Sequence, residues 1–311
     1  MDRGSKMTTT IENGVWPVMV TPFTEQNTID YDGVLELLDW YDKQNVTGIF
    51  AICQSSEMFF LSKKERLELL QFIRHNVPKR MGLIASGHVA ESLKDQISEA
   101  KAFLDTGIDS FVFITNQFAK QDETEESAKH RIEYLLNQID GESFGMYECP
   151  YPYKRLISPS LLSWCAHTGK FGFLKDTCCN LSELKAKISA VSNTPLKIFN
   201  ANGATLLDSL KMGAAGYSGV MANFHAQLYV WLCKHFSDEP EKAAKLQDLL
   251  GMASLVECQY YPVNAKYHLG LEGLNINLFS RVQDFSKFTA SKQLEVEQLR
   301  RTVQFAAESI L

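Results

Sequence analysis

Short apolar runs alternate with longer amphipathic stretches along the first two thirds of the chain. Eight runs of five or six residues stand out, at residues 16–20, 48–53, 82–86, 110–115, 143–148, 171–175, 196–200 and 216–220. Strands of nearly continuous apolar character are typical of a parallel sheet that helices cover. The pattern therefore predicts eight parallel strands.

The stretches between these runs carry apolar residues at spacings of three and four, with polar residues opposite, as amphipathic helices do. They cover residues 31–44, 63–75, 92–105, 123–138, 158–167, 181–191 and 204–212. Eight strands alternating with helices predict a closed (β/α)8 TIM barrel of the α/β class. An open sheet of Rossmann or flavodoxin type is the competing architecture. The strand number and the lack of a G-x-G-x-x-G motif after a strand disfavour it.

The strand pattern ends at residue 224. Residues 226–255 and 287–311 have helical periodicity, and residues 258–279 suggest a short helix with loops. We therefore expect a barrel at residues 10–224 and a C-terminal helical subdomain at residues 225–311. Residues 1–9 are expected to be a tag or a disordered N-terminus, because a second methionine stands at position 7 and no apolar signal-peptide core is present.

Composition narrows the range of functions. The 311 residues carry a formal net charge of −6 and no long cluster of Lys and Arg, which disfavours nucleic acid as a partner. No apolar run approaches the roughly 20 residues that a membrane span needs. The seven cysteines show no C-x-x-C spacing, and Cys178-Cys179 has no histidine at ligand spacing. We expect reduced thiols in a cytoplasmic protein and no bound metal.

Candidate chemistry lies at the carboxyl ends of the strands, where barrels carry reactive side chains. Lys175 ends the sixth run, where burial favours the free amine that attacks carbonyl carbons. Tyr147 ends the fifth run, and its phenol can relay a proton. An ion pair of Lys175 with Asp176 and a structural role for Tyr147 stay open at this point. Ser55 and Ser56 follow the second run, where they can bind a carboxylate or cap the next helix.

Four segments together resemble the motifs of the dihydrodipicolinate synthase and N-acetylneuraminate lyase superfamily, which are pyruvate-handling class I aldolases. Residues 147–150 (Tyr-Glu-Cys-Pro) are similar to the family's Y-N-x-P motif. Residues 172–177 are similar to its lysine motif, with one additional residue after the glycine. The G-[TS]-T-G-E motif has an altered form at residues 53–57, and residues 213–219 resemble the glycine-rich eighth strand. The order and spacing of these segments extend the resemblance over nearly the whole chain.

The resemblance implies an aldolase or lyase that forms a Schiff base. Lys175 would attack the keto carbon of pyruvate or another 2-keto acid, and the iminium would serve as the electron sink, so that no cofactor is needed. Tyr147 would move protons, and Ser55 and Ser56 would hold the substrate carboxylate. The other expected pocket residues are Gln54, Phe118, Tyr153 and Ser218. The family also implies a homo-oligomer built as a dimer of dimers.

Departures from the family pattern bear on the substrate. Phe118 stands where dihydrodipicolinate synthases carry a tyrosine that joins a neighbouring subunit's proton relay, and Pro152 stands where they carry a carboxylate-binding arginine. Gln54 replaces a relay threonine, and Ser56 replaces a glycine. These changes argue against the condensation of pyruvate with aspartate semialdehyde, which remains the alternative activity.

Two further alternatives are sialic acid as the substrate and a role without catalysis. Sialic acid lyases hold the polyol with an Asp-Glu pair after the seventh strand, where this chain has Gly203-Ala204, so cleavage of sialic acid is not supported. A non-catalytic member that binds a keto acid is the other alternative, but a protein that only binds has no need of an amine nucleophile. Aromatic residues near the barrel mouth suggest a substrate with some apolar surface.

Overall fold

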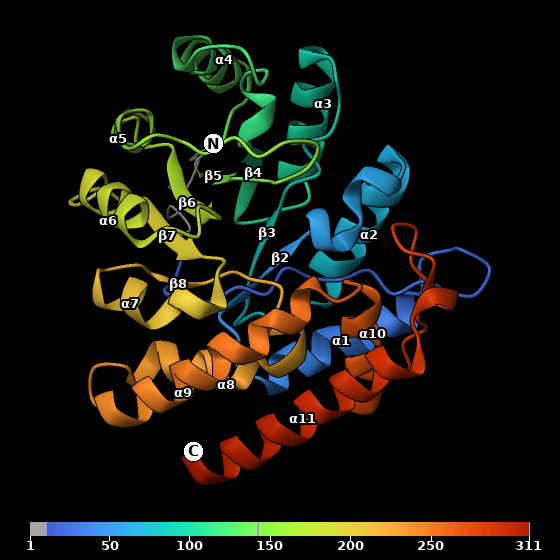
Figure 1. The fold of residues 1–311 in the computed structure, drawn as a ribbon. Coiled ribbons are helices and arrows are strands. Elements are labelled where there is room, and N and C mark those ends of the chain that lie inside the picture. Colours follow the sequence, from blue (N-terminus) through green and yellow to red (C-terminus); the bar gives the residue numbers. More distant parts are fainter. Residues whose placement is uncertain (1–10, 142, 311) are drawn as a thin grey trace.

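The barrel is built from one sheet of eight parallel strands (Figure 1). The computed structural model describes residues 11–141 and 143–310, so the expected tag or disordered segment at residues 1–9 lies outside the described residues. The strands are β1 (Gly14–Val15), β2 (Gly48–Ala51), β3 (Gly82–Ala85), β4 (Ser110–Ile114), β5 (Phe144–Tyr147), β6 (Phe171–Asp176), β7 (Lys197–Asn200) and β8 (Gly216–Tyr217). Each strand pairs with the next in the order β1-β8-β7-β6-β5-β4-β3-β2, and a bridge from Val18 to Phe50 closes the ring. The predicted (β/α)8 fold is confirmed.

Helices surround the sheet and continue beyond it. The barrel helices are α1 (Tyr31–Lys43), α2 (Lys63–Asn76), α3 (Leu93–Leu104), α4 (Glu125–Gln138), α5 (Pro159–His167), α6 (Leu181–Ala190), α7 (Leu206–Lys211) and α8 (Ala222–His235). They are followed by α9 (Pro240–Ala253), α10 (Val263–Leu271) and α11 (Ala290–Ile310), which lie with α8 on one side of the barrel in Figure 1. The expected boundary at residue 225 falls inside α8, and Pro240 divides the predicted helical stretch 226–255 by starting α9.

The first strand differs from the prediction. Residues 16–20 were expected to form it, whereas the ladder with β8 contains only Gly14 and Val15. Pro17 has no N–H group to donate to a ladder. Its carbonyl still accepts from the Phe50 N–H group, and the Met19 N–H group donates back to the Phe50 carbonyl. The segment therefore reaches β2 by a short bridge rather than by a continuous strand.

Aromatic side chains fill the barrel beneath its carboxyl-terminal end. The rings of Phe173 and Phe199 stack with centroids 4.7 Å apart, and Trp16 meets Phe173 edge-on at 6.2 Å. Phe50 lies against Phe173 at 5.9 Å and against Tyr147 at 5.7 Å. Such edge-to-face and offset contacts are the preferred geometries of aromatic pairs. The packed barrel thus supports the ring of Tyr147 from below.

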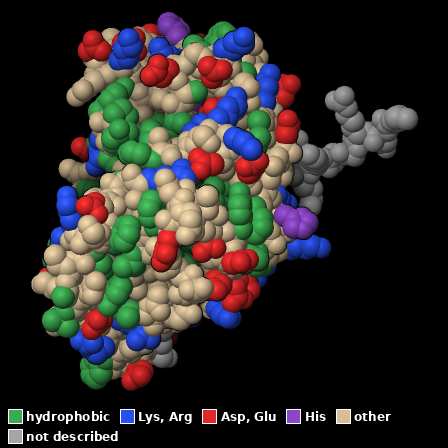
Figure 2. Space-filling view, turned by 90° about the vertical axis from the view of Figure 1, so that its right-hand side faces the viewer, with side chains coloured by type: hydrophobic (Ala, Val, Ile, Leu, Met, Phe, Trp, Pro, Cys, Tyr) green, Lys and Arg blue, Asp and Glu red, His purple; other side chains and the backbone are tan. Residues whose placement is uncertain are grey.

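The exposed surface carries both signs of charge. On the face drawn in Figure 2, acidic and basic side chains are interspersed and do not separate into fields of one sign. Interspersed charge does not create the extended positive potential that nucleic acids require. None of the described helices combines the length and the apolar character that a membrane crossing requires.

His88 is a buried histidine whose surroundings require the neutral ring. Its Nδ1 atom accepts from the Ile114 N–H group at 3.2 Å, and its Nε2 atom lies 3.0 Å from the side-chain oxygen of Gln96. A proton on Nδ1 would therefore oppose the Ile114 N–H group. Burial lowers the pKa of His88 to about 4, partly offset by the hydrogen bond to Gln96.

We expect His88 to make the free energy of unfolding depend on pH between about 6.5 and 4. In that interval the unfolded chain binds a proton that the folded chain does not, so stability falls as the pH falls. Urea unfolding of His88→Gln should show a slope smaller than that of the parent by about 1.4 kcal/mol per pH unit. His167→Gln, at an exposed position, is the matched control. Equal slopes for His88→Gln and the parent would contradict the assignment.

Candidate active site

A cavity of about 260 Å³ opens at the carboxyl-terminal end of the barrel. Four of the predicted site residues line it, namely Lys175, Tyr147, Gln54 and Ser55. They come from β6, from β5 and from the short 3-10 helix Gln54–Ser56 that follows β2. This is the end of a (β/α)8 barrel where active sites form.

Lys175 is held opposite Tyr147 by the register of β5 and β6. Its Nζ atom lies 4.4 Å from the centroid of the Tyr147 ring, and its side chain is buried. The adjacent Asp176 does not pair with it, because neighbouring residues of a strand point to opposite faces and the Asp176 carboxylate contacts Lys187. Burial lowers the pKa of the Lys175 ammonium. The site therefore contains a desolvated amine without a carboxylate partner.

Tyr147 is oriented by Gln54. The Tyr147 hydroxyl donates to the Gln54 side-chain oxygen at 3.3 Å, and the Cys149 thiol donates to the same oxygen at 3.3 Å. Burial raises the pKa of the Tyr147 phenol well above its usual range, to which nearby thiols add. The phenol therefore stays protonated and can act as a proton donor.

The two serines have different surroundings. Ser55 lines the cavity, whereas Ser56 does not. The Ser56 hydroxyl donates to the Met19 carbonyl at 2.6 Å and accepts from the Cys53 N–H group at 3.2 Å. These bonds hold the turn after β2 against the first segment of the barrel. Ser55 is therefore placed for contact with a ligand, whereas the Ser56 hydroxyl is bonded to backbone behind the turn.

Three other predicted pocket residues lie outside the cavity. Phe118 is buried against Phe113, with ring centroids 5.7 Å apart. The Tyr153 hydroxyl lies 2.7 Å from the carbonyl oxygens of both Asn116 and Ala119. Ser218 donates to the Trp16 carbonyl at 2.8 Å and so ties β8 to the first segment. The hydroxyls of Tyr153 and Ser218 are thus bonded to backbone, and the Phe118 ring packs in the core.

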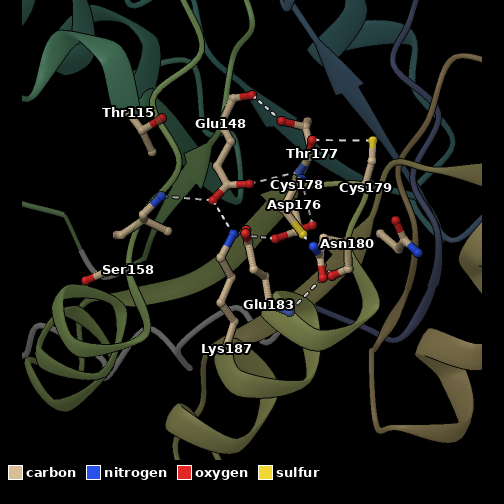
Figure 3. Close-up of polar contacts among 12 residues, drawn as sticks. Thr115, Glu148, Ser158, Asp176, Thr177, Cys178, Cys179, Asn180, Glu183 and Lys187 are labelled. Carbon is tan, nitrogen blue, oxygen red and sulfur yellow. Dashed lines mark hydrogen bonds and ion pairs between the residues drawn. The ribbon is translucent and has the colours of Figure 1, made fainter. Parts of the chain in front are cut away.

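A buried ion network lies behind the ends of β5 and β6 (Figure 3). Lys187 of α6 donates to Glu148 at 2.5 Å and to Asp176 at 2.6 Å, and all three side chains are buried. Glu148 also accepts from the N–H groups of Ile157 at 3.0 Å and Thr177 at 2.9 Å. Burial raises the pKa of the Glu148 carboxyl, as does the neighbouring Asp176, while Lys187 opposes the shift. The network joins the loops that follow both strands.

The C-terminal region supplies a wall of the site that the sequence did not predict. Tyr261, Pro262 and Val282 line the cavity. A second buried ion pair holds this wall, since Lys266 contacts Glu57 at 3.0 Å. Glu57 also accepts from the Arg281 N–H group at 2.6 Å. The altered motif at residues 53–57 contained Glu57, but its partners lie more than 200 positions later in the chain.

No metal or disulfide chemistry is built into the described part of the chain. In residues 11–141 and 143–310, no group of three or more His, Cys, Asp or Glu side chains is arranged to hold a metal ion. All seven cysteines are free, and Cys53 and Cys149 are buried beside the site. Burial raises the pKa of the Cys149 thiol to about 11, so it is protonated at neutral pH.

Fold and site together define a (β/α)8 barrel of the lysine-dependent aldolase class. The chain belongs to the dihydrodipicolinate synthetase family, whose model matches residues 12–302. Members of this family are lyase-type enzymes that bind pyruvate-type substrates, use a catalytic lysine Schiff base and usually form oligomers. The family membership and the aldolase-type function predicted from the motifs are confirmed, without an assigned acceptor.

Relatives with assigned names are distant in sequence. A 4-hydroxy-tetrahydrodipicolinate synthase of Clostridium perfringens is 24% identical over 259 residues, which is 83% of this chain and 87% of the relative. One from Clostridium acetobutylicum is 25% identical and covers 83% and 86%. Among solved structures, one similar fold is that of a prophage protein of the dihydrodipicolinic acid synthase family from E. coli K12, in complex with pyruvate. It superposes with a TM-score of 0.84 at 20% identity and covers 94% of this chain and 98% of that one. The sialic acid aldolase of Ruminococcus gnavus reaches 0.85 at 17% identity and covers 96% and 99%.

Removal of Lys187 should destabilise the fold, because Lys187 is the cation of the buried network. Lys187→Met leaves two buried carboxylates without a cation, and we expect the free energy of unfolding to fall by about 3–5 kcal/mol. Urea unfolding at pH 7.5 measures this loss. The loss should shrink as the pH is lowered toward 5, because protonation of one carboxylate removes the repulsion.

The matched control is Lys185→Met, an exposed position on the same helix, for which we expect a change within about 0.5 kcal/mol. A loss in Lys187→Met that does not respond to pH would mean that packing, rather than charge, accounts for the role of Lys187.

Proposed function

We propose that Lys175 forms a Schiff base with pyruvate or a related 2-keto acid and that the protein makes or breaks a C–C bond next to the keto carbon. The observation that supports this most is a contrast among the buried lysines. Lys187 and Lys266 each contact a carboxylate, at 2.5 Å and 3.0 Å. Lys175, equally enclosed, has no such partner among the described residues and faces the cavity. An unpaired buried amine spends more of its time uncharged, which is the nucleophilic form.

The proposed reaction proceeds through an imine. The Lys175 amine adds to the keto carbon, and the resulting carbinolamine loses its hydroxyl as water to give an iminium. In the cleavage direction, the substrate hydroxyl loses its proton, the adjacent C–C bond breaks, and the electron pair enters the iminium to form an enamine. An aldehyde leaves, the enamine takes a proton at carbon, and water releases the keto acid. The synthetic direction reverses these steps.

Tyr147 is proposed as the proton relay of these steps. Its ring contacts the Lys175 amine, and its hydroxyl is directed by Gln54 at 3.3 Å. A protonated phenol can donate to the departing hydroxyl of the carbinolamine and recover the proton from the substrate hydroxyl. Ser55 is the proposed partner of the substrate carboxylate, since it lines the cavity beside Gln54.

Two finer features, the assembly and the location, complete the proposal. We propose that the protein assembles as a dimer of dimers, which agrees with the usual oligomers of the family, and that it works in the cytoplasm, which agrees with its seven free cysteines. The names of the relatives keep 4-hydroxy-tetrahydrodipicolinate synthesis as an alternative activity.

Borohydride trapping tests the role of Lys175. Reduction in the presence of pyruvate should add the mass of one reduced pyruvate imine to the protein, and peptide mapping should place it on Lys175. Lys175→Ala should take up none, while Lys185→Ala, which removes an exposed lysine, should behave as the parent. A folded protein that neither pyruvate nor any other 2-keto acid labels at Lys175 would refute the proposal.

Tyr147→Phe tests the proton relay without needing an acceptor. Enamine formation exchanges the methyl protons of pyruvate with solvent, and NMR in heavy water measures this rate. We expect the exchange rate to fall by about 10²–10⁴-fold, the usual contribution of a positioned acid or base, with little change in the pyruvate concentration for half-maximal rate. An unchanged rate in Tyr147→Phe would remove the phenol from the mechanism.

A further inference from the structure

The cavity continues past Lys175 into a region walled by aromatic and aliphatic side chains. Phe59 and Tyr151 meet edge-on with ring centroids 4.7 Å apart, which brings the loop after β2 against the loop after β5. Tyr261, Val220 and Val282 complete the lining from the C-terminal side. This region is where a second substrate would meet an enamine on Lys175, and we name it the acceptor half of the site.

The loop that carries Tyr151 is fixed by hydrogen bonds to backbone. The side-chain amide of Asn116 donates to the carbonyls of Cys149, Tyr151 and Tyr153 at 2.8–3.0 Å. The Thr115 hydroxyl donates to the Arg155 carbonyl at 2.6 Å. The aromatic wall is therefore held in place before a ligand binds, which favours binding because less order is lost.

The charged groups of the acceptor half are already engaged. Apart from Lys175, the only charged side chain among the described residues that lines the cavity is Glu57. Its carboxylate accepts from Lys266, Ser280 and the Arg281 N–H group. The Arg281 guanidinium is in turn bound to Glu65 at 2.7 Å. Apart from Lys175, no cation among the described residues that line the cavity or bind Glu57 is therefore free to receive a second carboxylate.

Glu257 adds a negative charge on the side of Lys175. It lies in the 3-10 helix Ser254–Cys258, which leads to Tyr261. Burial raises the pKa of the Glu257 carboxyl to about 6, and the charge of Lys175 opposes that shift. The group is thus mainly ionised at pH 7.5, where it repels a second anion.

We propose that the acceptor half takes an uncharged aldehyde with an aromatic or branched aliphatic substituent and discriminates against acceptors that carry a carboxylate or a polyol. This inference rests on the proposed Schiff-base function of Lys175. The cavity volume of about 260 Å³ lies near the lower end of ligand sites, which limits the acceptor to about one ring. A polyol would bury hydroxyls against carbon, and unpaired hydroxyls weaken binding.

The test is an aldol addition of pyruvate to a panel of acceptors, with products measured by NMR. The panel comprises benzaldehyde, 2-methylpropanal, aspartate semialdehyde, glyceraldehyde and N-acetylmannosamine. We expect kcat/KM for benzaldehyde or 2-methylpropanal to exceed the other values by about tenfold or more. A preference for aspartate semialdehyde or a polyol overturns the inference, and so does the absence of product with both apolar aldehydes.

Borohydride trapping with pyruvate is carried out in parallel, so that failure of the acceptor inference can be distinguished from failure of the Schiff-base function. If Lys175 is labelled but the acceptor preference is anionic or polyhydroxylated, the inference about acceptors fails and the Schiff-base function stands. If Lys175 is not labelled by any keto acid, the function fails and the inference fails with it.

Two variants test which residues determine the preference among acceptors. Phe59→Ala should lower kcat/KM for benzaldehyde by about tenfold. Phe305→Ala removes an aromatic ring from the exposed face of α11 and is the matched control. Glu257→Gln should raise kcat/KM for aspartate semialdehyde relative to benzaldehyde by about fivefold or more. The inference is wrong if Phe59→Ala leaves kcat/KM for benzaldehyde unchanged and Glu257→Gln leaves the ratio of kcat/KM for aspartate semialdehyde to that for benzaldehyde unchanged. The acceptor would then bind elsewhere.

Discussion

The contact on which the site depends is the buried ion network of Lys187 with Glu148 and Asp176. Each acid directly follows a residue of the proposed chemistry, since Glu148 follows Tyr147 and Asp176 follows Lys175. Because side chains alternate along a strand, holding each acid behind the sheet fixes its neighbour toward the cavity. Buried charges are costly unless all partners are present, and here the backbone N–H groups of Ile157 and Thr177 add to Lys187. Because both buried carboxylates must be paired, the network aligns the ends of β5 and β6.

Contacts with carboxylates also distinguish Lys175 from the other buried lysines. Lys187 and Lys266 are bound to carboxylates, and neither side chain lines the cavity. Lys175 is buried to a similar extent, but Asp176, the acid next to it in sequence, is bound to Lys187. Its charged form then loses solvation without gaining a partner, which lowers the pKa of the ammonium. The nucleophilicity proposed for Lys175 therefore depends on stabilising contacts that never touch it.

Sequence patterns predicted the barrel and the core of the site because both depend on local signals. Apolar runs and helical periodicity marked the alternation, and a lysine at the end of an apolar strand marked the mouth. The pattern did not determine side-chain direction beyond the strand ends, so Phe118, Tyr153 and Ser218 were assigned to the pocket although they face core or backbone. Pairs separated by long stretches of sequence, such as Glu57 with Lys266, leave no periodic signal. They become visible only once the chain has folded.

This separation between local and distant signals also explains why family membership does not identify the acceptor. The lysine, its tyrosine and the turn at residues 53–57 lie within motifs, and we propose that they act on the keto acid that is common to these enzymes. The acceptor half is walled partly by Tyr261 and Val282, which lie in the C-terminal region outside every motif. Its position is set by the pair of Glu57 and Lys266. In the proposed mechanism, substitutions in this region would leave the imine chemistry intact and change what meets the enamine. The acceptor must therefore be inferred from the walls and charges of the cavity itself.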